Sequence, residues 1–444
     1  MSVREPARVL FLCWGPSVHA VRRIGLFVDD PSFAVGVAST HDHAFEGAEQ
    51  FLLSDEAARK AAMDRLHARE DYRGNRERMG FLPANGVRIG NRIRKAYAVW
   101  RALSGVGACN LATFRRVHGT WETVYQIDVG AMDLALLSRA VARFRPDVLF
   151  LQTMLYPCYL ATYLPRRIPS IVTFWNGDVV WWSQWDGADR HLKRAIVAAG
   201  ARRAAAVTVN SRIAAERCLE YGVPQERIHL IRYPGVDRER FSPGSKEEAR
   251  RALRIASGKV VFCPRGVEPY LNADVIVEAV GKVAAAVPDV LFVFASGGKG
   301  ETLLPNLLAR VRELGLADRV RWEGKIPFDT MPRYYRAADA MVSVSSRDSL
   351  PNCLLEAMAC GTPVILGDIP PIRDFVDEGV RGWLVPPRDA ERLAAALLEI
   401  LHADGEALSR IVRQNMDMVA READAEKGAA AIKALVRRVA GKEG

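Results

Sequence analysis

Apolar residues gather in short continuous runs along the chain, and the stretches between the runs repeat apolar positions with the period of a helix. Such runs are typical of parallel strands that helices cover on both faces. Strands are therefore expected at 8–14, 32–38, 147–151, 170–174 and 205–209, and again at 259–263, 290–295, 320–323, 340–344 and 363–366. The pattern predicts an α/β protein with doubly wound sheets.

A change of composition separates the two groups of strands. Proline, glycine and charged residues gather at 233–245, and a highly charged helix is expected at 246–254. Such a stretch is typical of a connection between domains, which places the boundary at 234–259. Beyond Arg388 the chain is expected to be helical, at 390–402 and, with interruptions, at 406–439.

The stretch 41–132 does not alternate strands with helices and is expected to be a helical insertion in the first domain. Its segment 89–103 has one apolar helical face, with basic residues elsewhere around the helix. The apolar positions are Ile89, Ile93, Ala96, Tyr97, Trp100 and Leu103. Such a helix either packs on a sheet or lies on an anionic membrane surface, and the sequence leaves both interpretations open.

The charge and the cysteines narrow the class of protein. The 444 residues carry 62 Lys and Arg against 52 Asp and Glu, a net charge of +10 that favours anionic partners. No recognition helix, RNA-binding run or zinc spacing supports nucleic acid. The 7 cysteines form no C-x-x-C pair and are typical of reduced thiols in a cytoplasmic protein. No apolar run reaches the roughly 20 residues of a membrane helix.

One segment, 345–365, combines several signals for a ligand site. A strand ends near Val344, a turn carries Asp348, and a helix is expected to start with Pro351 in its first turn and to stop at Gly361. Ligands of open α/β sheets bind at such strand ends, where the N–H groups around Leu350, Asn352 and Cys353 can receive a phosphate.

The two carboxylates of this segment allow two interpretations. Glu356 lies one turn into the helix, so it and Asp348 can accept hydrogen bonds from sugar hydroxyls. Alternatively, Asp348 caps the helix and Glu356 is merely exposed. The segment alone does not decide between them.

These motifs resemble those of the retaining glycosyltransferases of family 4. Asp348, seven intervening residues and Glu356, followed by Ala-Met-Ala-Cys-Gly-Thr-Pro-Val, resemble the E-x7-E region of that family. Further similar segments are Asn210-Ser211, Pro234-Gly235-Val236-Asp237 with Phe241, Cys263-Pro264-Arg265-Gly266, Gly324, Tyr334 with Ala337-Ala338-Asp339, and 379–387. The similarity therefore runs through nearly the whole chain.

The resemblance implies a GT-B fold, in which two Rossmann-like domains face a central cleft. Residues 1–235 are then expected to bind the acceptor and 236–420 the nucleotide sugar, with a helix at 421–444 that packs back on the first domain. No separate cofactor is implied, because the donor, a UDP- or GDP-sugar, is a substrate.

The resemblance also assigns roles to residues. Arg265 is expected to contact the donor diphosphate, Glu356 the ribose, Asp348 the transferred sugar and the backbone near Ile326 the base, while His19 and Asp178 are candidate acceptor contacts. The remaining candidates for the donor site are Gly15, Tyr270, Asn272, Gly297, Leu350, Pro351, Asn352 and Leu355.

Three positions depart from the family pattern. Asp348 stands where the family has Glu, Tyr270 where it often has Lys, and Trp175 where a His often stands. Gly297 lies in Gly-Gly-Lys-Gly, which resembles a phosphate loop but lacks the G-K-[ST] ending. The chain has no Asp-x-Asp pair to hold a metal–diphosphate complex, so transfer is expected to need no metal.

The sequence thus predicts an enzyme that transfers a sugar from a nucleotide donor to an acceptor hydroxyl, and the resemblance implies that it does so with retention. A glycan, a lipid-linked compound or a small molecule could be the acceptor, in the synthesis of a cell-surface polysaccharide or glycoconjugate. A nucleotide-sugar epimerase, a phosphorylase of similar architecture and a non-catalytic sugar-nucleotide-binding protein are the alternatives. A cytoplasmic location is expected, and the basic helix allows a position at the inner face of the membrane.

Overall fold

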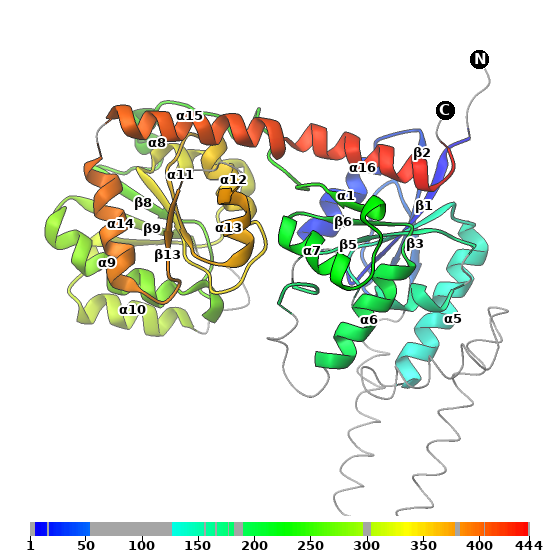
Figure 1. Cartoon of the computed structure of the whole chain (residues 1–444). Helices are drawn as coiled ribbons and strands as arrows, with labels where there is room; N and C mark the ends of the chain where they lie inside the picture. The colour runs from blue at the N-terminus through cyan, green and yellow to red at the C-terminus, as the bar shows by residue number, and fades with distance from the viewer. Residues whose placement is uncertain are drawn as a thin grey trace, which may run out of the picture. The chain divides into compact units, whose positions relative to one another are not determined.

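The computed structural model describes residues 5–15, 17–53, 127–154, 157–164, 167–175, 177–181, 190–295, 303–377, 382–403 and 405–442 (Figure 1). These residues form two compact units. The first takes its residues from 1–209, 214–230 and 431–444, and the second from 210–213 and 231–430. The predicted helix at 89–103 and Gly297 lie outside the described residues.

Within the described part of the first unit, seven parallel strands form one sheet in the order β3-β2-β1-β4-β5-β6-β7. Their bounds are β1 Ala7–Cys13, β2 Phe33–Ser39, β3 Glu49–Leu52, β4 Val148–Leu151, β5 Ser170–Thr173, β6 Ala206–Val209 and β7 Ile228–Leu230. The central strands bury side chains on both faces, so a continuous apolar run is what they need.

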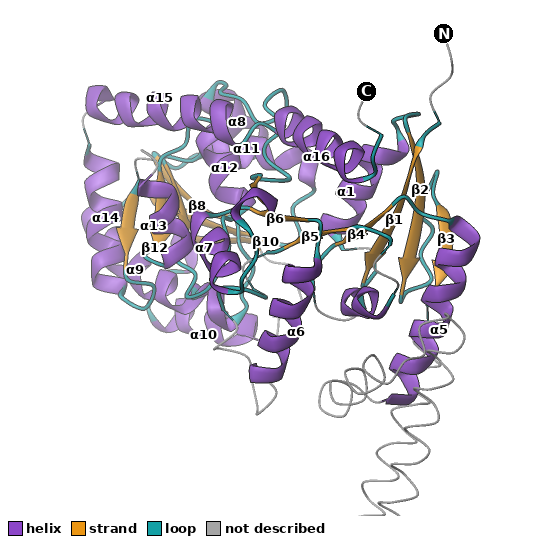
Figure 2. Cartoon of the chain, turned by 45° about the vertical axis from the view of Figure 1, so that its right-hand side comes forward, coloured by secondary structure: helices purple, strands orange, loops and turns teal. Residues whose placement is uncertain are grey.

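Helices pack around these strands (Figure 2). They are α1 Val18–Val28, α5 Ile127–Phe144, α6 Arg190–Arg203 and α7 Arg212–Glu220, with short 3-10 turns at Cys158–Tyr163 and Gln225–Arg227. Ser17 starts α1, because its side chain accepts a hydrogen bond from the N–H of Ala20. Leu10, Leu149 and Val172 belong to a large apolar core on one face of the sheet. Phe11, Phe27 and Phe150 are buried and pack together on the other face.

The described strands of the second unit form a parallel sheet in the order β10-β9-β8-β11-β12-β13. Their bounds are β8 Lys259–Cys263, β9 Val290–Ala295, β10 Val320–Glu323, β11 Ala340–Ser343, β12 Val364–Gly367 and β13 Trp383–Val385. A second apolar core lies between this sheet and its helices. The predicted α/β class with two doubly wound sheets is therefore confirmed.

The helices that follow alternate with these strands and then continue along the chain, and the last of them ends in the first unit. They are α8 Lys246–Ala252, α9 Ala273–Ala286, α10 Leu304–Glu313, α11 Met331–Ala337, α12 Asn352–Ala359, α13 Pro370–Asp377, α14 Ala390–His402, α15 Gly405–Glu422 and α16 Ala425–Val439, with 3-10 turns at Pro269–Leu271, Ala317–Arg319 and Phe328–Thr330. The helix predicted at 246–254 ends earlier, because Arg254 has a positive φ of 54°.

The end of α16 belongs to the first unit and is bonded to the loop before β2. Lys433 Nζ lies 3.0 Å from Asp30 Oδ2, and Arg437 Nη2 donates to Ser32 Oγ at 2.6 Å. Although some burial opposes it, hydrogen bonds from Ser32 and Lys433 hold the pKa of Asp30 at about 2. The chain therefore returns to its first unit after it has completed the second.

The connection between the units is fixed to the turn between α15 and α16. The N–H of Val236 donates to the carbonyl of Ala423 at 2.8 Å, and the N–H of Ala425 donates to the carbonyl of Val236 at 3.0 Å. Gly235 has a φ of 69°, and a Cβ placed on it would lie 2.6 Å from the Ala423 oxygen. Only glycine fits there, because both its φ and the close backbone exclude a side chain.

Candidate functional site

The strand order of the second sheet reverses between β8 and β11. From β8 the chain continues to β9 on one side, and from β11 to β12 on the other. Open α/β sheets bind ligands outside the carboxyl ends of the strands at such a switch point. Arg265 follows β8 and Asp348 follows β11, so both lie at this point.

An ion pair joins these two residues. Arg265 Nη1 lies 2.9 Å from Asp348 Oδ2, and the side chains retain exposed fractions of 25% and 15%. Burial raises the pKa of Asp348, and the attraction of Arg265 opposes this increase. Burial acts against the charge of Arg265, but Asp348, Cys353 and Tyr270 together outweigh burial and raise the pKa of the guanidinium. Arg265 is therefore a permanent positive charge at the switch point.

The helix that follows Asp348 starts one residue later than predicted. Pro351 has an extended ψ of 136° and is the N-cap of α12, rather than a residue of its first turn. The proline ring restricts φ and leaves ψ free, so a φ of −75° suits either position. The N–H groups of Asn352 and Cys353 stand in the first turn of α12, where a helix supplies no acceptors of its own.

The helix brings a second contact to Arg265. Cys353 Sγ lies 3.9 Å from Arg265 Nη1 and accepts a weak hydrogen bond from it. The thiol is buried, and burial raises its pKa, so it is neutral and adds no charge to the pair. Arg265 thus lies between the loop after β11 and the first turn of α12.

Glu356 is buried, with an exposed fraction of 8%, and its Oε2 accepts a hydrogen bond of 2.9 Å from the hydroxyl of Tyr335. The interpretation of Glu356 as merely exposed is therefore wrong. Asp348 does not cap α12 either, because the cap residue Pro351 makes no side-chain bond and Asp348 Oδ1 accepts from the N–H of Ser349. The alternative interpretation, a helix cap for Asp348 and an exposed position for Glu356, is therefore wrong for both carboxylates.

Two further predicted donor residues bond within the protein. The Tyr270 hydroxyl donates to Glu268 Oε2 at 3.0 Å, and the Arg347 guanidinium lies over the Tyr270 ring. Asn272 has a left-handed φ of 55°, and its Nδ2 donates at 2.7 Å both to the carbonyl of Val344 and to Ser346 Oγ. Asn272 thereby ties the start of α9 to the loop that carries Asp348, and its contact with a donor stays a prediction.

The remaining candidates of the second unit can contact a donor mainly through their backbone N–H and C=O groups. Leu350 and Leu355 have exposed fractions of 5% and 2%, because their side chains belong to the core. Ile326 is partly buried in the loop after β10, and the contact of its backbone with a base stays a prediction.

The first sheet has its own switch point, between β1 and β4. Gly15 lies in the loop after β1, and a Cβ placed there would come within 2.8 Å of the His41 ring. The His41 Nδ1 in turn lies 2.5 Å from the carbonyl of Trp14. The absence of a side chain at Gly15 thus has a structural reason, and its predicted approach to a phosphate is untested.

His19, in the first turn of α1, packs against Trp175 with the rings tilted by 34° and their centroids 4.5 Å apart. Burial lowers the pKa of His19, and the positive charges of Arg23 and Arg22 lower it further, so the neutral imidazole prevails near pH 7. Trp175, where the family often has His, donates from Nε1 to the carbonyl of Gln152 at 2.6 Å. Trp175, in the loop after β5, is thus bonded to the loop after β4.

Asp178, another predicted acceptor contact, is buried in the turn after β5. Its Oδ2 accepts from the Thr153 hydroxyl at 2.9 Å and its Oδ1 from the N–H of Trp175 at 3.2 Å. Burial raises its pKa to about 6, although these donors act in the opposite direction. Asp178 therefore titrates near neutral pH.

Sequence reasoning missed three buried residues near these sites. Tyr335 contacts Glu356, whereas the resemblance drew attention to its neighbour Tyr334. Arg23 is 1% exposed, with its guanidinium 5.1 Å from the Trp175 ring, and Gln152 follows β4 with neither Oε1 nor Nε2 bonded to a described residue. The sequence marked these three residues only as polar groups, either next to a strand end or on the buried face of a helix.

Two features are absent from the described ranges. Within them, no three His, Cys, Asp or Glu side chains gather as ligands for a metal ion. None of their helices combines the length and the apolar character needed to cross a membrane. Independence from metals stays a prediction.

Two family models match the chain. Residues 257–403 match the model described as glycosyl transferases group 1, and residues 109–240 match glycosyltransferase family 4. A D-inositol 3-phosphate glycosyltransferase of Geodermatophilus obscurus is 35% identical over 227 residues, which cover 50% of each chain. That of Thermobispora bispora is 37% identical over 188 residues, 41% of this chain and 44% of the relative. The match thus spans about half the length of these relatives.

Solved structures show a similar fold at low identity. HepE of Anabaena in complex with UDP has a TM-score of 0.68 at 16% identity and covers 98% of this chain and 100% of its own. Sucrose-phosphate synthase of Thermosynechococcus elongatus has a TM-score of 0.67 at 17% identity, with coverage of 98% and 100%. The two family models together match more than half of the residues. With its two Rossmann-like sheets, the chain belongs to the family 4 glycosyltransferases of GT-B fold.

Proposed function

We propose that this chain moves a sugar from a UDP- or GDP-sugar to an acceptor hydroxyl, with retention and without a metal. The observation that carries the proposal is the Arg265–Asp348 pair beside the first turn of α12. It combines a positive charge, a helix N-terminus and a carboxylate at the switch point of the sheet. The structures of HepE with UDP and with UDP-glucose support a nucleotide-sugar donor.

In this proposal the diphosphate binds Arg265 and the N–H groups at the start of α12. The planar guanidinium suits two phosphate oxygens, and the helix end adds partial positive charge. Asp348, now bonded to Arg265, turns to the hydroxyls of the transferred sugar, Glu356 accepts from the ribose hydroxyls, and the backbone near Ile326 meets the base.

The reaction needs no protein nucleophile. The bond from the anomeric carbon to the diphosphate oxygen breaks, and its electron pair leaves with the diphosphate. The acceptor oxygen attacks on the same face and transfers its proton to the departing diphosphate oxygen, so the sugar retains its configuration. Arg265 stabilises the negative charge as it develops, which is the contribution of a preorganised cation to the rate.

The acceptor is assigned to the first unit, with His19 and Asp178 as candidate contacts. A glycan or a lipid-linked compound fits the proposal, and the name of the curated relatives adds inositol phosphate to the acceptors worth testing. A neutral His19 can accept a proton or a hydrogen bond from a hydroxyl.

The test is a panel of UDP-, GDP-, ADP- and dTDP-sugars, with thermal shifts for binding and product analysis for transfer. Arg265→Ala should reduce kcat/KM by about 10² or more, as loss of one preorganised donor does. Arg310→Ala is the matched control, because Arg310 pairs with Glu278 on exposed helix surfaces. Isomerised donor, binding without transfer, or an unchanged Arg265→Ala enzyme would each contradict the proposal.

A further inference from the structure

The contact between Tyr335 and Glu356 joins α11 to α12, the helix that starts at the switch point of the second sheet. Tyr335 belongs to α11, is 0% exposed, and donates to Glu356 Oε2 at 2.9 Å. Burial raises the pKa of Tyr335 well above its usual value, and Glu356 raises it further. The phenol is therefore a hydrogen-bond donor throughout the range of pH in which an enzyme works.

Tyr335 is itself held from several sides. Its ring lies edge-on to Phe262 of β8, with centroids 5.3 Å apart, and also packs on Phe241 at 6.1 Å. Its backbone carbonyl accepts a 2.8 Å bond from the Thr362 hydroxyl, just beyond α12. The position of the hydroxyl is thus determined by the sheet, by α12 and by the segment that enters the unit.

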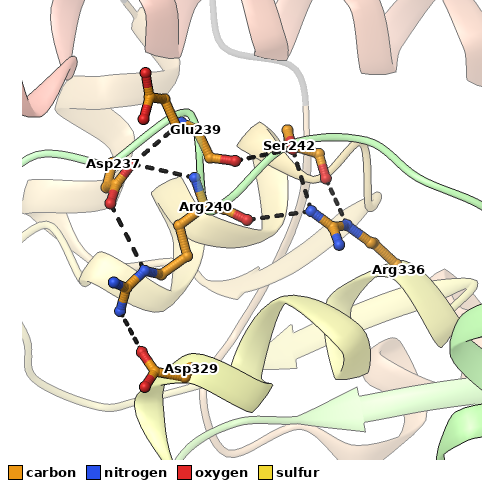
Figure 3. A network of polar contacts seen from close by, with 6 residues as sticks. All are labelled: Asp237, Glu239, Arg240, Ser242, Asp329 and Arg336. Atoms are coloured by element: carbon orange, nitrogen blue, oxygen red, sulfur yellow. Dashed lines mark hydrogen bonds and ion pairs between the residues drawn. The ribbon is translucent and has the colours of Figure 1, made fainter.

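The next residue, Arg336, fixes α11 to that segment (Figure 3). Its Nε donates to the carbonyl of Ser242 at 2.7 Å, and its Nη2 donates at 3.1 Å to the carbonyl of Arg240 and to Ser242 Oγ. Arg240 in turn pairs with Asp329, at the turn before α11. Phe241 lies between these anchors, so the wall against which Tyr335 packs is fixed as well.

A glutamate needs such support if it is to select one ligand geometry. Its side chain has several rotatable bonds, and an unsupported carboxylate must lose that freedom when the ligand binds. We infer that Tyr335 is a positioning residue, which holds the carboxylate of Glu356 ready for the ribose hydroxyls of the donor nucleotide. This inference rests on the proposed role of Glu356.

The test compares wild type, Tyr335→Phe, Tyr334→Phe, Glu356→Gln and the double variant Tyr335→Phe/Glu356→Gln. Tyr334 is the matched control, because it lies on the same helix with its ring stacked on Phe262, and its hydroxyl bonds Glu323 rather than Glu356. Calorimetry with UDP and GDP gives the affinity, steady-state kinetics give KM and kcat, and thermal unfolding reports on the fold.

Tyr335→Phe should raise the Kd of the nucleotide and the donor KM about tenfold, the order expected for one hydrogen bond to a charged group, with kcat nearly unchanged. Tyr334→Phe should behave as wild type. In the Glu356→Gln background the same change should have little further effect, because the charged partner is gone. A purely structural role would lower kcat and the melting temperature together and leave KM unchanged.

The outcomes separate the two proposals. If Glu356→Gln weakens nucleotide binding and Tyr335→Phe does not, the positioning role is wrong and the proposed function stands. If wild type binds no nucleotide, or Glu356→Gln binds as wild type, the role of Glu356 fails and the inference falls with it. If Tyr335→Phe does not fold, Phe241→Leu should give a smaller rise in Kd, and a wild-type Kd for that variant overturns the inference.

Discussion

Asp348 and Glu356 lie on different elements near the carboxyl ends of the strands of the second sheet. Asp348 lies in the loop and bonds Arg265, whereas Glu356 lies in α12 and bonds Tyr335. Because the two carboxylates have different partners and lie on different elements, we expect Asp348 to bind the transferred sugar and Glu356 the nucleotide.

We expect Asp348→Ala to lower kcat much more than it weakens nucleoside diphosphate binding. The contact with the sugar strengthens in the transition state, and loss of Asp348 also removes a competitor of the diphosphate for Arg265. Glu356→Gln should do the reverse and weaken binding of the nucleoside diphosphate. Asp348→Glu, which restores the length the family uses, should be tolerated better than Asp348→Ala.

Calorimetry with the free nucleoside diphosphate, beside steady-state kinetics on the three variants, measures both quantities. Glu313→Gln, an exposed carboxylate on α10, serves as the control. Equal effects of Asp348→Ala and Glu356→Gln on both quantities would show that the tasks are not divided.

Asp178 should make stability depend on pH. Its folded pKa of about 6 lies above the usual value of 3.8, because the carboxyl is buried. The folded state therefore binds the proton more tightly, which contributes stability that is complete below about pH 4 and is lost as the pH rises through 6. The difference between the two pKa values corresponds to about 3 kcal/mol.

Asp178→Asn cannot titrate, so the free energy of unfolding of wild type minus that of the variant should fall by about 3 kcal/mol between pH 4 and 7. Urea unfolding at a series of pH values measures it. Asp318→Asn, at an exposed position, should follow wild type throughout. A difference that does not change with pH would mean that Asp178 has the same proton affinity in both states.

At the scale of elements, the strands that the sequence missed are β3, β7 and β13. All three lie at sheet edges, and each has at least one side chain that is only partly buried. An edge strand needs no continuous apolar run, because one of its sides faces no neighbour in the sheet. In Glu49-Gln50-Phe51-Leu52 two polar residues precede two apolar ones, so the segment has neither a continuous apolar run nor an alternation and gave no strand signal.

The connection at Gly235 offers a test at this scale. Gly235→Ala should destabilise the second unit by about 2 kcal/mol or more, because alanine meets both an unfavourable φ and the backbone of Ala423. Denaturant unfolding measures the loss.

Gly428→Ala is the matched control. Gly428 lies inside α16 and nothing stands within 4 Å of its added Cβ, so alanine should stabilise the helix by about 0.5–1 kcal/mol. Opposite signs for the two Gly→Ala changes are therefore expected. If Gly235→Ala leaves the free energy of unfolding unchanged, the turn between α15 and α16 can shift to accommodate the added Cβ without loss of stability.

At the scale of the whole molecule, the net charge of +10 and the basic helix predicted at 89–103 bear on where the enzyme acts. We expect the full chain to sediment with vesicles that contain phosphatidylglycerol at low salt, and less at physiological salt, because salt screens the attraction. Neutral vesicles should bind much less.

Arg92→Glu/Lys95→Glu should reduce this binding, whereas Lys259→Glu, at the start of β8, leaves the predicted helix unchanged and is the control. Absence of binding to either type of vesicle at both salt concentrations would favour the interpretation of 89–103 as a helix packed on a sheet.

The sequence by itself determined the class of the fold and most of its elements. Buried parallel strands require continuous apolar residues, and these runs placed β1, β2, β4, β5, β6 and β8 to β12 within about one residue of their bounds. Local chemistry likewise placed the loop with Asp348 and the helix with Glu356, because turn and helix signals act between neighbours in the chain.

Only the tertiary structure decided the partners of the buried polar groups. Arg265 and Asp348 are far apart in the chain and meet because β8 and β11 are adjacent in the sheet. Tyr335 reaches Glu356 because α11 packs against α12, which no periodicity within either helix reveals. A local pattern reports which face of an element is buried, whereas the atom that a buried polar group meets depends on how distant elements pack.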